Sequence, residues 1–242
     1  MSYKNYFFLK ITKAGGTTLI DSLLTPYLKV QYRNAKPKPF ILSKKEEYND
    51  VLNNFRIPLG EYQNRRSLFA KQILYKDEWE DIFSFAISRE PISRCVSMFN
   101  YLYYNKSSYI NNLISVLKDN YYYSKKINFT KSYSFDVFLD LIEQSHNSDS
   151  YYKPRGLHFS THVAKMYDDV TDNNGKIILS KIYRLENIST IVDDLNRHFQ
   201  YDLVFRNKIL NKSSNKFIPS KSQIKKIEQL FIDDFTIYEN AN

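Results

Sequence analysis

Residues 6–19 read Tyr6-Phe7-Phe8-Leu9-Lys10-Ile11-Thr12-Lys13-Ala14-Gly15-Gly16-Thr17-Thr18-Leu19. An apolar run of strand length leads into two adjacent glycines, which open a predicted helix. The chain of 242 residues has only 5 glycines, so the placement of two of them side by side is a distinctive feature. We interpret the pair as a turn that lets a ligand approach the backbone, with helix N-terminal amides facing an anion. Lys13 adds a positive charge at the mouth of this loop.

The order of residues separates this loop from the phosphate loop of nucleotide hydrolases. That pattern needs a lysine and a serine or threonine directly after its last glycine. Here Lys13 precedes both Gly15 and Gly16. A P-loop kinase or another nucleotide-binding protein therefore remains only an alternative interpretation.

Composition bounds the class of protein. A hydrophobic fraction of 43% and an aromatic fraction of 16% are ample for a packed core, and the length suits one domain over residues 1–242. The net charge of +9 favours an anionic partner. The basic residues are dispersed along the chain, so a non-catalytic binder of RNA or polyanions is the weaker alternative, and we expect no nucleic-acid partner.

The remaining compositional signals concern location. Cys95 is the single cysteine, which excludes an internal disulfide. The sequence has no secretory signal and no apolar run long enough to span a membrane. We therefore expect a cytoplasmic protein without a membrane span, with the reservation that the chain is also compatible with a trimmed catalytic domain.

Apolar runs and helical periodicity alternate along the chain. They predict strands at 5–11, 81–88 and 181–185, and helices at 17–29, 91–104, about 108–118, 134–145, 189–199 and 220–238. Ser134 is the expected cap of its helix, and residues 66–76 fit either a helix or a strand. The alternation predicts an α/β fold with a parallel sheet covered by helices on both faces. We expect residues 105–155 to form a helical insertion or an acceptor-binding region.

A second motif follows the second predicted strand and reads Arg89-Glu90-Pro91-Ile92-Ser93-Arg94-Cys95-Val96-Ser97. Arg89 stands where the strand ends, and its guanidinium can form paired hydrogen bonds to a phosphate. Ser97, two turns into the helix, reaches the same anion if the ligand lies along that helix. In doubly wound sheets, ligands lie beyond the carboxyl ends of the strands. Two strand ends with phosphate-binding groups therefore imply one ligand with two separated phosphates.

The ordered pair of motifs resembles that of the sulfotransferases that use 3′-phosphoadenosine 5′-phosphosulfate, specifically the branch of carbohydrate sulfotransferases. In that family a Lys-x-Gly-Gly-Thr-Ser/Thr loop holds the 5′-phosphosulfate, and an Arg-x-Pro-x-x-Arg-x-x-Ser segment holds the 3′-phosphate. The resemblance implies a P-loop-like three-layer fold with a central parallel sheet flanked by helices. It assigns the 5′-phosphosulfate to Lys13, Ala14, Gly15, Gly16, Thr17 and Thr18, and the 3′-phosphate to Arg89 and Ser97.

The C-terminal third carries further similarity. Residues 183–188 resemble a family strand that ends in an acidic residue. Leu210-Asn211-Lys212-Ser213-Ser214 resembles an Asn-x-Ser loop that approaches the nucleotide, which adds Lys212 and Ser213 to the implied nucleotide site.

The resemblance also implies a reaction. A sulfuryl group moves by in-line displacement from the donor to an acceptor hydroxyl, expected on a carbohydrate, and leaves adenosine 3′,5′-bisphosphate. Lys13 neutralises the bridging oxygen as its bond to sulfur breaks, and the scheme requires no metal.

The acceptor hydroxyl needs a general base, for which the sequence offers three candidates. His158 and Phe159 resemble a histidine–aromatic pair of carbohydrate sulfotransferases, and His162 stands where a glutamine often appears in that branch. Glu61, in a basic segment, is the third candidate, because this chain lacks the histidine that several relatives carry between the two motifs. A structural role for these histidines, or a metal pair lacking a third ligand, stays open. Lys71 and Arg155 are candidate acceptor or sulfate contacts.

Overall fold

The computed structural model describes residues 3, 5–19, 59–104, 109–124, 130–148, 155–201, 203–204 and 217–242. Within these ranges a three-stranded sheet, ordered β1-β2-β3, forms the centre of the α/β part. The strands are β1 (Asn5–Leu9), β2 (Ile82–Ser88) and β3 (Lys181–Arg184). Both pairings are parallel, with Phe8 opposite Phe85 and Ala86 opposite Ile182. The carboxyl ends of all three strands therefore meet at one edge of the sheet.

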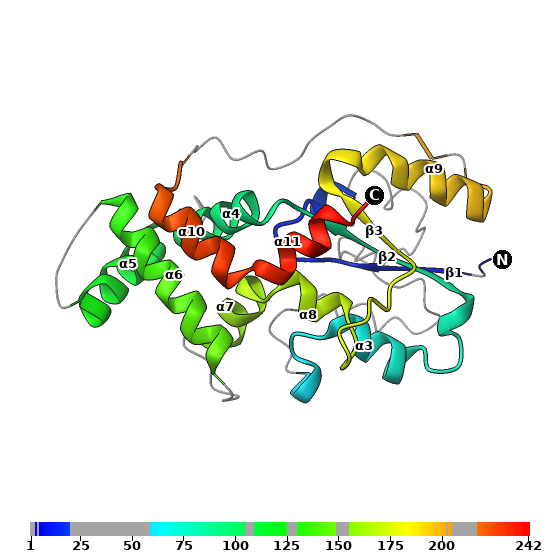
Figure 1. The fold of residues 1–242 in the computed structure, drawn as a ribbon, viewed down its shortest axis with the longest axis horizontal. Helices are drawn as coiled ribbons and strands as arrows, with labels where there is room; N and C mark the ends of the chain where they lie inside the picture. Colours follow the sequence, from blue (N-terminus) through cyan, green and yellow to red (C-terminus); the bar gives the residue numbers. More distant parts are fainter. Residues whose placement is uncertain are drawn as a thin grey trace.

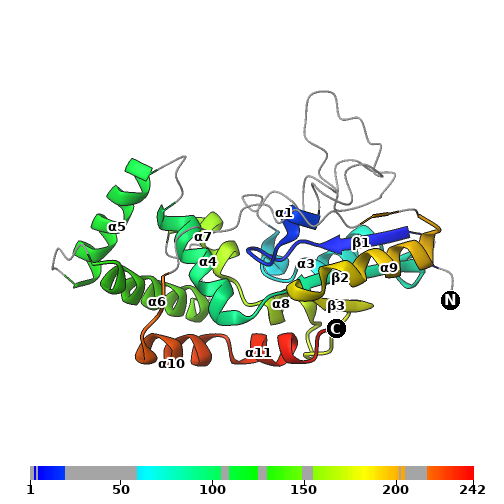
Figure 2. The ribbon, with the colours of Figure 1, turned by 90° about the horizontal axis from the view of Figure 1, so that it is seen from above.

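The two faces of the sheet bury different side chains, because successive residues of a strand point to opposite faces. Phe8 and Phe85 pack in one core with α1 (Gly16–Leu19) and α9 (Ile188–Phe199). Phe7 and Ala86 pack in another core, with α8 (Met166–Val170) and α11 (Ile232–Glu239). Figures 1 and 2 show the strands between these layers. The predicted three-layer arrangement around a parallel sheet is confirmed.

The connection from the first to the second strand contains short helical elements. These are a 3-10 turn at Gly60–Tyr62, α3 (Arg66–Phe69) with a π-helical turn at Ala70–Leu74, and a 3-10 turn at Trp79–Asp81. Residues 66–76, which the sequence left undecided, are therefore mainly helical. A further 3-10 turn, Leu185–Asn187, joins β3 to α9.

A helical lobe extends from one end of the sheet (Figure 1). It contains α4 (Pro91–Tyr104), α5 (Tyr109–Ser124), α6 (Lys131–Asn147), α7 (Gly156–Val163) and α10 (Lys221–Leu230). Its core is rich in aromatic rings, with Phe99 packed edge-on against Phe135 at 4.9 Å between ring centroids. None of the helices in the described part of the chain is both long and apolar enough to cross a membrane.

Two sequence predictions about helix boundaries were wrong. The helix predicted at 220–238 is broken at Phe231, whose ring is buried in the helical core, so α10 and α11 are separate. Ser134 lies inside α6, and Thr130 is the cap, since its hydroxyl accepts a hydrogen bond from the backbone N–H of Tyr133. The chain ends alongside β3, where Arg184 N donates to Asn242 O (2.7 Å).

Candidate functional site

The loop after β1 changes direction through two residues in the left-handed region. Lys13 has φ 60° and Gly15 has φ 85°. The N–H of Thr18 donates to Gly15 O (2.9 Å) as α1 begins, so the preceding amides of Gly16 and Thr17 lie at the open N-terminus of the helix. Such amides suit an anion.

The two glycines are also required by packing within the protein. A Cβ atom on Gly15 would collide with Cδ1 of Leu185, directly after β3, and one on Gly16 would lie 2.8 Å from Cγ of Lys10. The sequence interpretation explained the glycines by approach of a ligand alone. The structure adds an internal reason, because the loop passes directly over neighbouring side chains.

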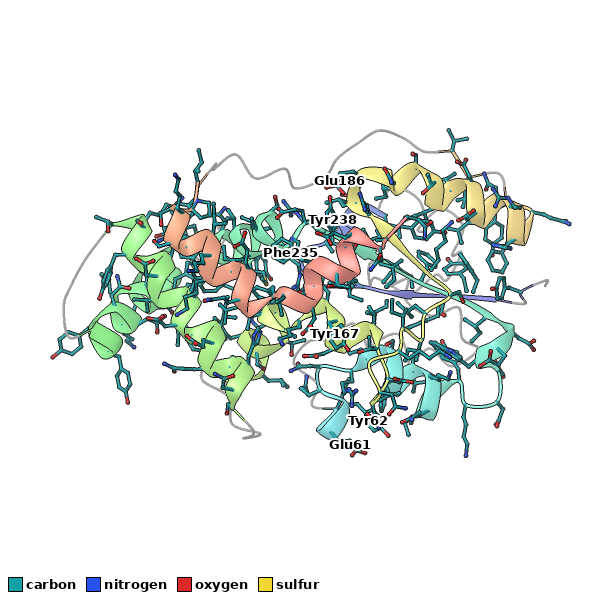
Figure 3. All side chains as sticks on the ribbon, viewed as in Figure 1. Glu61, Tyr62, Tyr167, Glu186, Phe235 and Tyr238 are labelled. Atoms are coloured by element: carbon teal, nitrogen blue, oxygen red, sulfur yellow. The ribbon has the colours of Figure 1, made fainter. Side chains whose placement is uncertain are left out.

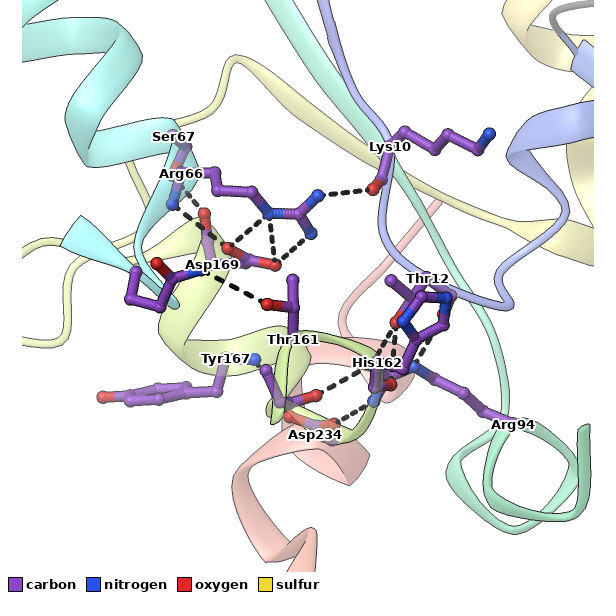
Figure 4. A network of polar contacts seen from close by, with 12 residues as sticks. Lys10, Thr12, Arg66, Ser67, Arg94, Thr161, His162, Tyr167, Asp169 and Asp234 are labelled. Atoms are coloured by element: carbon purple, nitrogen blue, oxygen red, sulfur yellow. Dashed lines mark hydrogen bonds and ion pairs between the residues drawn. The ribbon is translucent and has the colours of Figure 1, made fainter. Parts of the chain in front are cut away.

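A buried arginine of α3 holds the start of this loop. Arg66 donates from Nη1 to Lys10 O (3.1 Å), and its guanidinium pairs with Asp169 of α8, including Nε to Oδ1 at 3.1 Å (Figure 4). Both side chains are almost completely buried. Removing either partner of such a buried ion pair is strongly destabilising, because the other charge stays buried without compensation. The pair therefore fixes the position of the loop.

A second buried arginine, from α4, holds the middle of the loop. Arg94 donates from Nε to Thr12 O (3.1 Å), from Nη2 to Ala164 O (2.8 Å) and from Nη1 to Asp234 Oδ2 of α11 (3.1 Å) (Figure 4). Burial raises the pKa of the Asp234 carboxyl, and the Arg94 guanidinium opposes that rise. Arg94 is the second arginine of the quoted motif, and its contacts are those of a residue that supports the loop.

Arg89 brings the second motif to the first. It follows the end of β2, and its Nη1 donates to Lys13 O at 3.1 Å. Its guanidinium is half-buried, and burial lowers its pKa against the opposing influence of Glu186 and Glu90. Ser97 lies two turns further along α4 and is half-buried. The backbone of the loop and the guanidinium of Arg89 are therefore in direct contact at the carboxyl edge of the sheet.

Lys13 lies among cations and an aromatic ring. Its Nζ lies 4.2 Å from the ring centroid of Tyr101, on α4. Burial, followed by the charges of Arg89 and Lys10, lowers the pKa of Lys13 to about 8. Three cationic side chains thus converge at the loop, which is an arrangement that an anion would relieve.

The two candidate histidines lie beside the same loop. Both are on α7, with their ring centroids 4.3 Å apart. The ring of His162 stacks on Tyr101 at 5.1 Å and an interplanar angle of 15°, and Thr12 Oγ1 donates to His162 O (2.9 Å). The residues predicted from separate parts of the sequence are therefore brought together around Tyr101.

The two histidines differ in environment. His162 is buried, and burial, followed by the neighbouring His158, lowers its pKa to about 3, so the ring is neutral. Its Nδ1 lies 2.7 Å from His158 O. Since a carbonyl oxygen only accepts, Nδ1 carries the proton and Nε2 has the lone pair. His158 is half-buried.

The other predicted residues lie elsewhere or have other partners. Glu61 is exposed in the turn Gly60–Tyr62, at the edge of the molecule beside α3 (Figure 3), and its carboxylate makes no hydrogen bond or ion pair with the described residues. Arg155 forms an ion pair with Asp119 and so links the start of α7 to α5. Lys71 has an acidic partner, with its Nζ 3.8 Å from Glu80 Oε1. Lys212 and Ser213 lie outside the described residues.

Sequence reasoning missed several residues that shape the site: Thr12, Arg66, Tyr101, Asp169 and Asp234. It also gave Arg94 no role. One signal was present for Arg94, because it falls between Pro91 and Met98 on the buried face of α4, where a charge needs a buried partner. Tyr101 follows Ser97 by one helical turn and so shares its face.

Comparisons with known proteins agree with the motifs. A family model described as "Sulfotransferase family" matches residues 3–240, which is nearly the whole chain. No curated protein and no solved structure matches.

Proposed function

The chain belongs to the sulfotransferase family, and from this premise we propose that it transfers a sulfuryl group from 3′-phosphoadenosine 5′-phosphosulfate to a carbohydrate hydroxyl. The observation that carries the proposal is the contact of Arg89 Nη1 with Lys13 O (3.1 Å), which joins the two motifs that resemble the family's phosphate-binding segments. A donor with phosphates at its 5′ and 3′ positions needs two such groups side by side.

The charges of the loop support an anionic donor. Burial lowers the pKa of Lys13 to about 8, and the nearby charges of Arg89 and then Lys10 act in the same direction. The amides of Gly16 and Thr17 add donors at the start of α1. We assign the 5′-phosphosulfate to Lys13 and to residues 14–18, and the 3′-phosphate to Arg89 and Ser97.

In the proposed reaction the sulfuryl group passes directly from the donor to the acceptor, without a covalent bond to the protein. The acceptor oxygen forms a bond to sulfur while the bond from sulfur to the 5′-phosphate oxygen breaks. The proton of the hydroxyl passes to a base, and the electron pair of the broken bond stays on the phosphate, where Lys13 neutralises the charge. Positioning and electrostatic stabilisation supply most of the acceleration in group transfer of this type.

We assign the general base to His158. It is half-buried on α7, next to His162, whose ring stacks on the same tyrosine that Lys13 contacts. His162 is less suited because burial disfavours its protonated form. Glu61 lies at the exposed edge of the molecule (Figure 3). The carbohydrate acceptor rests on the resemblance of His158-Phe159 to that branch of the family.

A transfer assay with donor labelled in its sulfuryl group tests the proposal. Carbohydrate acceptors and tyrosine-bearing peptides form the two arms, and we expect label on a carbohydrate. His158→Ala should lower kcat by about 10²-fold or more, whereas Glu61→Ala and the control His198→Ala, on α9, should leave it unchanged. Transfer to peptides alone would overturn the acceptor class. Full turnover in His158→Ala would show that the base is misassigned, and His162→Ala would then test the other histidine.

A further inference from the structure

Tyr101 lies between the loop that carries Lys13 and the helix α7 that carries the two histidines. It lies in the last turns of α4 and is half-buried. Its ring centroid is 4.2 Å from Lys13 Nζ, 5.1 Å from the ring of His162 and 6.4 Å from the ring of His158. One aromatic ring therefore contacts the lysine of the loop and stacks on His162 of α7, with His158 nearby.

The ring suits the charge of Lys13. Among the described residues, Arg89 after β2 and Lys10 on its own loop act on the charge of Lys13, Lys13 acts in turn on His162, and the ring of Tyr101 lies against the ammonium. The face of an aromatic ring is electronegative and attracts an ammonium group. It does so without a formal negative charge, so it does not repel an incoming phosphate as a carboxylate would.

The ring also links α7 to the loop. It stacks almost flat on His162, with an interplanar angle of 15°. The carbonyl of His162 accepts the hydroxyl of Thr12, the residue directly before Lys13. Two contacts therefore connect the loop to α7: Lys13 contacts α7 through the ring of Tyr101, and Thr12 contacts it directly at His162 O.

We infer that Tyr101 is a positioning residue: its ring holds the Lys13 ammonium and, by stacking on His162, holds the helix α7 that carries His158 in register for transfer. The inference rests on the proposed function, since it gives that register a purpose. Its physical basis is preorganisation, because groups that are already held in place need no reordering when the reaction occurs.

The first test measures Lys13 itself and does not need turnover. The rate at which the Lys13 amine reacts with acetic anhydride is followed against pH by mass spectrometry, in the absence of nucleotide. Tyr101→Leu removes the ring and should lower the midpoint by about half a unit to one unit. Tyr101→Phe keeps the ring and should keep the midpoint, as should Tyr122→Leu, whose side chain on α5 is 80% exposed.

The second test separates this inference from the proposed function. Adenosine 3′,5′-bisphosphate should protect Lys13 from acylation in the unaltered protein, and absence of protection would count against the proposed function only. With protection present, an unchanged midpoint and unchanged kcat in Tyr101→Leu would overturn the role of Tyr101. We expect kcat to fall about 10-fold or more in that variant and to be retained in Tyr101→Phe. If Tyr101→Leu fails to fold, Tyr101→Met provides the same comparison with a more adaptable side chain.

Discussion

Replacing Lys13 by methionine should make the protein more stable at neutral pH. Methionine keeps most of the unbranched side chain and has the same backbone strain at φ 60°, but it carries no charge. Burial, Arg89 and Lys10 lower the pKa of Lys13 from 10.5 to about 8, which means that the folded protein disfavours its ammonium form. The positive charge of Lys13, which the proposed reaction needs, therefore lowers the stability of the folded protein.

The magnitude follows from the pKa shift. Each unit corresponds to about 1.4 kcal/mol, so the full shift corresponds to about 3 kcal/mol. The attraction to the Tyr101 ring, on the order of 1 kcal/mol, opposes this penalty. Lys13 is also only half-buried, so solvent screens part of the repulsion. We expect Lys13→Met to raise the free energy of unfolding by about 1–2 kcal/mol at pH 7.

The sign of the pH dependence provides a second check. The unfolded chain holds the Lys13 proton up to the ordinary pKa of 10.5, whereas the folded protein releases it near pH 8. Between these values the unfolded state binds more protons, so the unaltered protein gains stability as the pH rises. The advantage of Lys13→Met should therefore be complete below pH 8 and shrink towards pH 10.5.

Urea denaturation at a series of pH values measures the change in the free energy of unfolding and its dependence on pH. The comparison requires equal m-values for the two proteins. Lys225→Met, at an exposed position of α10, is the matched control and should change stability by less than about 0.5 kcal/mol. A Lys13→Met protein that is less stable at pH 7, or an advantage that does not change with pH, would refute the reasoning.

Three further predictions concern the same loop. The kcat/KM of the unaltered protein should fall above about pH 8, as Lys13 loses its proton in the free enzyme, and a profile that stays flat to pH 10 would contradict this. Arg94→Leu leaves the Asp234 carboxyl buried without its ion pair, and urea denaturation should show a free energy of unfolding about 3–5 kcal/mol lower. A loss below about 1 kcal/mol would mean that the pair does not hold the loop. Gly15→Ala should cost more than about 2 kcal/mol, because φ is unfavourable and the new Cβ meets Leu185. Adding Leu185→Ala should recover the steric part, and additive effects of the two changes in thermal melts would argue against that contact.

Local sequence signals predicted the elements that frame the site. β2 and α4 have nearly the predicted limits, because an apolar run ends at Arg89-Glu90-Pro91 and proline favours the first turn of a helix. Parallel pairing then brings Arg89 to Lys13, as the alternation of strands and helices indicated. These features depend on short stretches of sequence and on the general geometry of parallel sheets.

The buried ion pairs could not be predicted in the same way. Arg94 meets Asp234 across 140 positions of sequence, and Arg66 meets Asp169 across 103. No local period links such partners, so a buried arginine and a phosphate-binding arginine look alike in a single sequence. The structure separates Arg94, which supports the loop from within, from Arg89, which lies half-buried at the edge of the sheet.

The histidine pair shows an intermediate case. The sequence predicted no helix at this place, and the structure puts both histidines on α7, four residues apart and so on one face of it. Tyr101 of α4 lies between them and Lys13, and its ring contacts with Lys13 and His162 both join residues far apart in the sequence. Aromatic residues are abundant in this chain, so composition alone could not single it out.

Calorimetric titration with adenosine 3′,5′-bisphosphate in the absence of magnesium tests the central claim most directly. We expect one site, weakened about 10-fold or more by Lys13→Ala and by Arg89→Ala, and unaffected by Lys225→Ala. Adenosine 5′-phosphate should bind more weakly than the bisphosphate, and Arg89→Ala should abolish that preference. Magnesium-dependent binding of ATP, with no response to the bisphosphate, would contradict the account.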